Sequence, residues 1–115
     1  MYKELVVGDK TYKLRLTTMA LLNIEKALGY NPISLFINMS MDSIPKLKDL
    51  LIVFHGMLQP LQHGITFEDA CNIFDEYSEE GHTQFDLIPL FMDVFVDGGF
   101  LQSDDEEEED NSKNA

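Results

Sequence analysis

Five apolar residues in the middle of the chain repeat at the spacing of one face of an α-helix. Relative to the first of them, the others follow after three, four, seven and eleven residues, as Leu47, Leu50, Leu51, Phe54 and Leu58. Such a stripe allows a helix to pack against a hydrophobic core. Ser43 is a candidate cap, Pro45 then falls in the first turn, and Pro60 ends the segment. We therefore predict a central amphipathic helix whose apolar face other elements must cover.

Further helices are predicted on both sides of this one. Residues 19–28 have helical spacing and end at Gly29, and Asn31-Pro32 is a start signal for a short helix over 33–39. Thr66 with Asp69 is a variant capping box that opens a fourth helix. Its expected buried stripe is Phe67, Ala70, Cys71, Phe74 and Tyr77.

The last helix has two possible starts. If Asp86 is the cap, Pro89 lies in the first turn and costs no hydrogen bond; if Thr83 is the cap, Pro89 lies inside the helix and should bend it. Gly98-Gly99 ends the helix, and Phe100 and Leu101 are positioned to fold back onto the core.

The N-terminal residues have the alternation of β-strands. Segments 3–7 and 11–16 flank Gly8-Asp9, which is turn chemistry, so a hairpin is predicted. A lone hairpin is marginal in water and must lie on the helices or pair with a strand of another chain. The predicted fold is mainly α: a small bundle of four to five helices with an N-terminal β-hairpin, formed by residues 1–102. Residues 103–115, with seven consecutive acids from Asp104 to Asp110, are predicted to be a disordered tail.

Charge is distributed unevenly along the chain, whose net charge is −13. Residues 1–48 carry seven basic and four acidic side chains, whereas residues 49–115 carry one basic and seventeen acidic ones. Phosphate backbones repel such a surface, so nucleic-acid binding is not expected. A basic protein partner would be attracted, but the simpler explanation of the charge alone is that acidity keeps the protein soluble. The longest apolar run, residues 50–54, is far too short for a membrane span. One cysteine and no apolar leader favour a reducing, cytoplasmic location.

The residues that could carry chemistry do not form a catalytic or metal pattern. His55, His63, His82 and Cys71 lack paired ligand spacing, and no phosphate-binding glycine motif is present. The carboxylates of residues 75–80 fall on the polar face of a predicted helix, whereas catalytic carboxylates need burial or close pairing. We therefore expect no enzyme activity, no catalytic residues, no metal site and no cofactor.

Residues 87–96 carry apolar side chains on more than one face of the predicted helix, whereas packing against the core requires only one apolar face. Part of this surface is therefore expected to meet another chain. The first candidates for partner contact are Phe91, Met92, Phe95 and Phe100, and the alternates are Leu87, Leu90 and Val94. Core packing is the competing explanation for each one.

Three sequence stretches carry a resemblance to a known family. They are GDKTYKLRLT at residues 8–17, ALLNIEKALG at 20–29 and DGGFL at 97–101. Over about residues 5–101 the chain resembles the tail assembly chaperones of long-tailed phages and prophages of Gram-positive bacteria, in their short form. This resemblance implies a non-enzymatic factor that binds the tape measure protein, keeps it soluble and helps tail tube subunits polymerise around it. It also implies action in the host cytoplasm and absence from the finished virion, and the extra apolar surface leaves room for a homo-oligomer.

Two other hypotheses remain open at this stage. The first is an acidic protein that mimics DNA and inhibits a basic nucleic-acid-binding protein, which would need carboxylates spaced like phosphates on a folded face. The second is a small metal-dependent enzyme.

Overall fold

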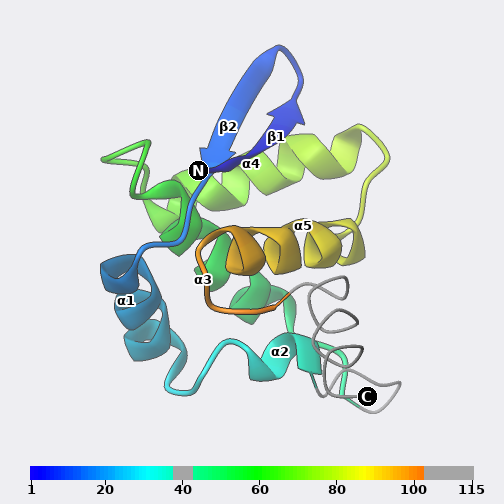
Figure 1. The fold of residues 1–115 in the computed structure, drawn as a ribbon. Coiled ribbons are helices and arrows are strands. Elements are labelled where there is room, and N and C mark those ends of the chain that lie inside the picture. The colour runs from blue at the N-terminus through cyan, green and yellow to red at the C-terminus, as the bar shows by residue number, and fades with distance from the viewer. Residues whose placement is uncertain (38–42, 103–115) are drawn as a thin grey trace, which may run out of the picture.

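The structure, a computed structural model, describes residues 1–37 and 43–102. Two strands precede five helices (Figure 1): β1 (Lys3–Val7), β2 (Lys10–Leu14), α1 (Thr18–Leu28), α2 (Ser34–Ile37), α3 (Leu47–Leu58), α4 (Phe67–Glu79) and α5 (Gln84–Asp97). The predicted small helical bundle with an N-terminal β-hairpin is confirmed. The proposed tail, residues 103–115, lies outside the described residues.

The central helix is α3, against which α1, α4, α5 and β2 all pack. Its side chains at Leu50, Val53, Phe54, Met57 and Leu58 are at most 1 % exposed. The Phe54 ring stacks on Phe91 of α5 with ring centroids 6.1 Å apart. The predicted stripe is therefore the core face of α3, except that Leu47, at the start of the helix, is exposed.

The hairpin lies on the helices, as one of the two alternatives predicted. β1 pairs antiparallel with β2, and Leu5, Val7 and Leu14 face the core. Both α4 and α5 contact β1. The second strand ends at Leu14 and not at residue 16, because Leu14 pairs with Lys3, the first residue of β1. The N–H of Arg15, which follows it, donates to the carbonyl oxygen of Met57 in α3 (3.0 Å).

The sequence predicted the start of α4 correctly and the start of α3 wrongly. Thr66 and Asp69 form the expected capping box at α4, with reciprocal N–H···O distances of 2.9 and 3.0 Å. The predicted start of α3 at Ser43 was wrong: the helix begins at Leu47 after Lys46 in extended backbone, and Pro45 is buried ahead of it.

Two further predictions need correction. The short helix α2 begins at Ser34, one residue later than predicted, and is described to Ile37; residue 39, its predicted end, lies outside the described residues. In α4 the buried residues are Ala70, Ile73 and Tyr77, whereas Phe67 is exposed. The α4 stripe is therefore rotated toward Ile73, which is one turn before Tyr77.

Within the described residues, no helix is both long and apolar enough to cross a membrane.

Candidate protein-binding surface on helix α5

Helix α5 is fixed in place by its N-terminal turn and by its apolar face. Thr83 is the cap: its N–H donates to the Asp86 carboxylate (2.9 Å), and the N–H of Asp86 donates to the Thr83 carbonyl oxygen (3.0 Å). Pro89 therefore lies inside the helix, which continues to Asp97. One face of α5 is buried through Leu87, Ile88, Phe91, Val94 and Phe95. The edge of the Phe95 ring packs against Phe36 of α2, with centroids 5.3 Å apart.

Next to its buried face, α5 carries a second apolar row, which we call the α5 stripe: Phe85, Pro89, Met92 and Val96. Their spacing of four, three and four residues places them along one line of the helix, beside the buried Ile88 and Phe95. Phe85 is 49 % exposed and Met92 is 37 % exposed; Pro89 is exposed as well, and Val96 is partly buried. An unpartnered apolar row on a helix that already fills the core is a candidate contact surface for another protein.

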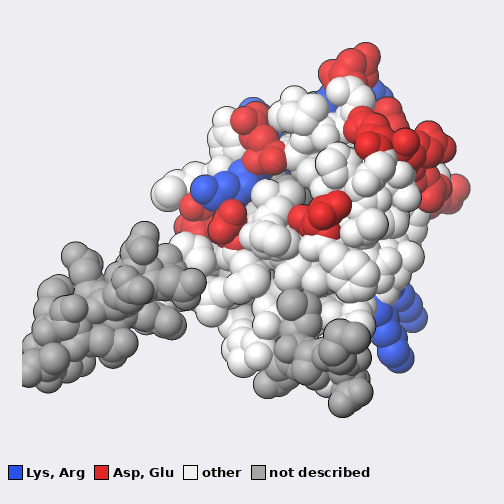
Figure 2. All heavy atoms as spheres, turned by 90° about the vertical axis from the view of Figure 1, so that its right-hand side faces the viewer, with Lys and Arg blue, Asp and Glu red and all other residues white. Residues whose placement is uncertain are grey.

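Acidic side chains run beside the α5 stripe. Asp86, Asp93 and Asp97 follow each other at intervals of seven and four residues, one helical row away. The Oδ2 atom of Asp86 lies 3.6 Å from Nδ1 of His82, and Oδ1 of Asp97 lies 3.8 Å from Nζ of Lys3. Asp93 has no ion pair with any described residue. Figure 2, which views the molecule from the side of the loop between α4 and α5, shows many more acidic than basic side chains on this face. The surface therefore combines apolar contact with negative charge.

The seven residues predicted to bind a partner do not form one surface. Leu87, Phe91, Val94 and Phe95 are at most 1 % exposed. In this conformation they are core residues, unavailable to a partner, because α2, α3 and the hairpin cover that face. Leu90 and Phe100 are partly buried and pack against the core, so only Met92 is exposed.

Phe85 and Pro89 were missed by the sequence analysis. Both lie outside the contact set that was predicted, although both align with Met92 at helical spacing. The repeat of Asp86 and Asp93, seven residues apart, was the signal that separates this side of the helix from the buried one.

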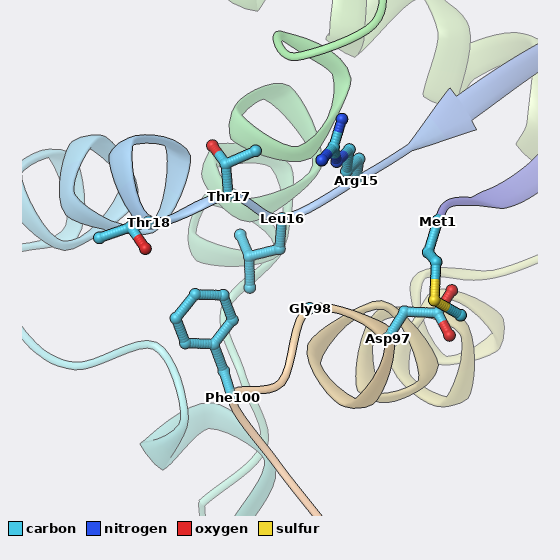
Figure 3. A pocket seen from close by; sticks show the side chains of 8 residues that line it. All are labelled: Met1, Arg15, Leu16, Thr17, Thr18, Asp97, Gly98 and Phe100. Atoms are coloured by element: carbon cyan, nitrogen blue, oxygen red, sulfur yellow. The ribbon is translucent and has the colours of Figure 1, made fainter.

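A hollow of about 310 Å³ lies where the end of α5 meets the link between β2 and α1. Its lining includes Arg15, Thr17, Asp97 and Phe100, and Figure 3 shows the Phe100 ring facing the side chain of Leu16. The Thr17 hydroxyl accepts a hydrogen bond from the N–H of Ala20 (3.1 Å), because it caps α1. The polar groups of the hollow thus serve the fold or face solvent, and they do not form an arrangement of nucleophile and base.

Other polar groups considered for chemistry have structural contacts. His55 Nε2 lies 3.0 Å from the carbonyl oxygen of Ile65, and the His82 ring stacks on Tyr77 with centroids 4.2 Å apart. Burial, followed by the charges of Asp86 and Glu80, raises the pKa of Tyr77. The Glu80 carboxylate accepts a hydrogen bond from the N–H of Gly8 at the hairpin turn. Among residues 1–37 and 43–102, no group of three or more His, Cys, Asp or Glu side chains is arranged to hold a metal ion.

Comparison with known proteins gives one match. No curated protein and no solved structure is similar enough to match the chain. Residues 1–113 match a protein family, and the chain therefore belongs to DUF6096, described as a family of unknown function.

Proposed function

We propose that this protein is a non-enzymatic chaperone of phage tail assembly, which binds the tape measure protein through helix α5 and assists assembly of the tail tube. In this proposal the protein acts in the cytoplasm of the bacterial host and leaves before the virion is complete. The observation that carries the proposal is the α5 stripe with its row of aspartates. The resemblance of residues 8–17, 20–29 and 97–101 to tail assembly chaperones suggests the identity of the client.

The proposed contact is between two amphipathic helices, α5 and a helical segment of the client. An exposed apolar row at positions i, i+4, i+7 and i+11 matches the apolar stripe of a second helix laid along it. The neighbouring aspartates favour a client helix with Lys or Arg beside its apolar positions. Charge of this kind mainly speeds the encounter and selects the partner, while the apolar contact holds the complex together.

Met92 suits a client that offers several similar segments. Its unbranched thioether side chain adapts to different neighbours at little cost. A long helical client with repeated apolar segments could therefore be held by the same surface at more than one place along its length.

Co-expression tests the proposal. The full chain is produced together with the tape measure protein of the same genome, and the soluble fraction is purified through a tag on the chain. We expect the client to be soluble only in the presence of the chain and to co-purify with it. A client that is equally insoluble with and without the chain, with no complex recovered, would contradict the proposal.

A further inference from the structure

The hairpin has one edge that is partly covered and one edge that is open. On the β2 side, the Gln62 side chain accepts a hydrogen bond from the N–H of Lys13 (2.6 Å) and donates one to its carbonyl oxygen (2.7 Å). One step further, the N–H of Arg15 donates to Met57 (3.0 Å). The end of α3 and the turn after it therefore occupy the outward hydrogen-bonding positions at Lys13 and Arg15, whereas the outward groups of Thr11 have no hydrogen-bond partner among the described residues.

The strand register shows which backbone groups of β1 point outward. Because both backbone groups of Lys13 face Gln62, its pairing with Glu4 is a non-hydrogen-bonded pair. Pairs alternate along an antiparallel ladder, so the pairing of Val6 with Thr11 is also non-hydrogen-bonded. The N–H and C=O groups of Glu4 and Val6 thus face away from β2, and none of them has a hydrogen-bond partner among the described residues.

β1 has some but not all of the devices by which proteins block exposed strand edges. It is short and carries the charged residues Lys3 and Glu4, but it pairs with β2 residue for residue, without a bulge, and contains no proline. Val6 is 60 % exposed on the outer face of the strand. A two-stranded sheet gains most from an added strand, since three or more strands are usual for independent stability.

We infer that β1 is the self-association edge of this protein, where a second copy adds its own β1 antiparallel to form a four-stranded sheet. The register that uses all four outward groups on each strand sets Leu5 opposite Leu5 of the second copy. Glu4 then forms a hydrogen-bonded pair with Val6 of the second copy, and Val6 with Glu4. Shifting the register to place Glu4 opposite Glu4 would bring like charges together, which is destabilising. This inference does not depend on the chaperone proposal, because it uses a different surface and a different partner.

The same strand indicates which segment binds at the β1 edge. An extended segment is required, because the outward groups recur at every second residue, and β1 of a second copy is extended and has the complementary groups in that register. Two copies related by a two-fold axis make an isologous contact, which closes at two copies and does not propagate. The net charge of −13 opposes association at low salt, so dimerisation should strengthen as salt screens the repulsion.

A matched pair of proline variants tests the inference. Val6→Pro removes the outward N–H of β1, and Thr11→Pro removes the equivalent outward N–H of β2 directly across the hairpin, while both leave the β1–β2 hydrogen bonds in place. Sedimentation velocity of the full chain is followed over a range of concentrations at low and high salt, with circular dichroism to verify folding. We expect a dimer for the parent chain and for Thr11→Pro, and a dissociation constant raised at least about tenfold for Val6→Pro.

Amide hydrogen exchange of the parent chain supplies a second readout if a proline variant fails to fold. The N–H groups of Glu4 and Val6 should become protected as concentration rises through the dimerisation range, while that of Thr11 should not. A parent chain that stays monomeric at all concentrations, a dimer unaffected by Val6→Pro, equal loss in both variants, or no protection at Glu4 and Val6 would each overturn the inference.

Discussion

Gly56 of α3 lies directly against Ile24 of α1: a Cβ atom on Gly56 would be 2.2 Å from Cγ1 of Ile24. The Ile24 side chain is 1 % exposed and fills the space that a side chain at residue 56 would need. The absence of a side chain at Gly56 therefore sets how closely α1 approaches α3.

Gly56→Ala should destabilise the protein. Alanine is favoured over glycine in a helix by about 1 kcal/mol, but forcing a methyl group into this contact costs about 1–3 kcal/mol. We expect a net loss of up to about 2 kcal/mol in urea unfolding, with the largest loss if α1 cannot shift away. In an Ile24→Ala background the same substitution should cost less, because the clashing side chain is gone. An equal cost in both backgrounds would show that the two residues are not coupled.

Gln62 should stabilise the hairpin on the helices. Its amide bonds both backbone groups of Lys13 and also donates to the carbonyl oxygen of Leu58 (2.9 Å). Gln62→Ala should lower the free energy of unfolding by about 1–2 kcal/mol, as expected for a few partly exposed hydrogen bonds. Gln62→Glu keeps an acceptor but loses the donor, so it should be destabilised at neutral pH and recover partly in acid, when the introduced carboxyl is protonated. Urea unfolding of Gln62→Glu and of the parent chain at both pH values measures this. The prediction is contradicted if the loss of stability in Gln62→Glu relative to the parent chain is the same at both pH values.

Tyr30 should ionise at a higher pH than an ordinary tyrosine. Burial first, then the hydrogen bond from its hydroxyl to Asp49 (2.8 Å) and the charge of Asp49, raise the pKa of Tyr30 to about 12 from its ordinary 10.0. The folded state therefore favours the neutral phenol, so this contribution to stability is present below pH 10 and is lost between pH 10 and about 12.

Ultraviolet titration of tyrosinate absorbance measures this directly. Tyr30→Phe should remove the component with a pKa of about 12, and Asp49→Asn should move that component to lower pH. Tyr77→Phe is the control, because it removes a different tyrosine of raised pKa. An unchanged final component in Tyr30→Phe would contradict the assignment.

Deleting residues 103–115 should separate the chaperone proposal from the DNA-mimic hypothesis. The deletion removes seven acids and one lysine, which changes the net charge from −13 to −7. A chaperone that binds through α5 should keep its client. A charge mimic should lose affinity sharply and show a steep salt dependence, because its binding would follow the number of carboxylates. Binding of the tape measure protein and of a basic DNA-binding protein, each measured at two salt concentrations, distinguishes the two.

The sequence predicted the elements of this fold better than their faces. Periodic apolar residues and clear caps, such as Thr66 with Asp69, were sufficient for the hairpin and the helices. In α5 the apolar periodicity alone did not identify the buried face, because apolar residues occupy both that face and the α5 stripe, and only Asp86, Asp93 and Asp97 mark the exposed side. Only the three-dimensional packing shows that Phe91 and Phe95 face α3 and α2 while Phe85 and Met92 face solvent.

Boundaries were the other weak point, for local reasons. Ser43 and Pro45 form a plausible helix start, but Pro45 is buried before the helix and Lys46 is extended. Thr83 and Asp86 both had cap chemistry; the structure uses Thr83 as the cap and Asp86 as the residue that bonds back to it. Tertiary packing decided each case, and a single sequence does not contain that information.

The central claim is that the α5 stripe binds the client, and one comparison tests it most directly. The double variant Phe85→Asp and Met92→Asp places charge on the stripe. The double variant Met19→Asp and Leu22→Asp places the same charge on exposed residues of α1 that are 65 % and 52 % exposed. Each folded variant, verified by circular dichroism, is co-expressed with the tape measure protein, and the amount of client that co-purifies is measured. We predict that the α5 variant loses the client while the α1 variant retains it; retention by the α5 variant, or equal loss from both, would contradict the account.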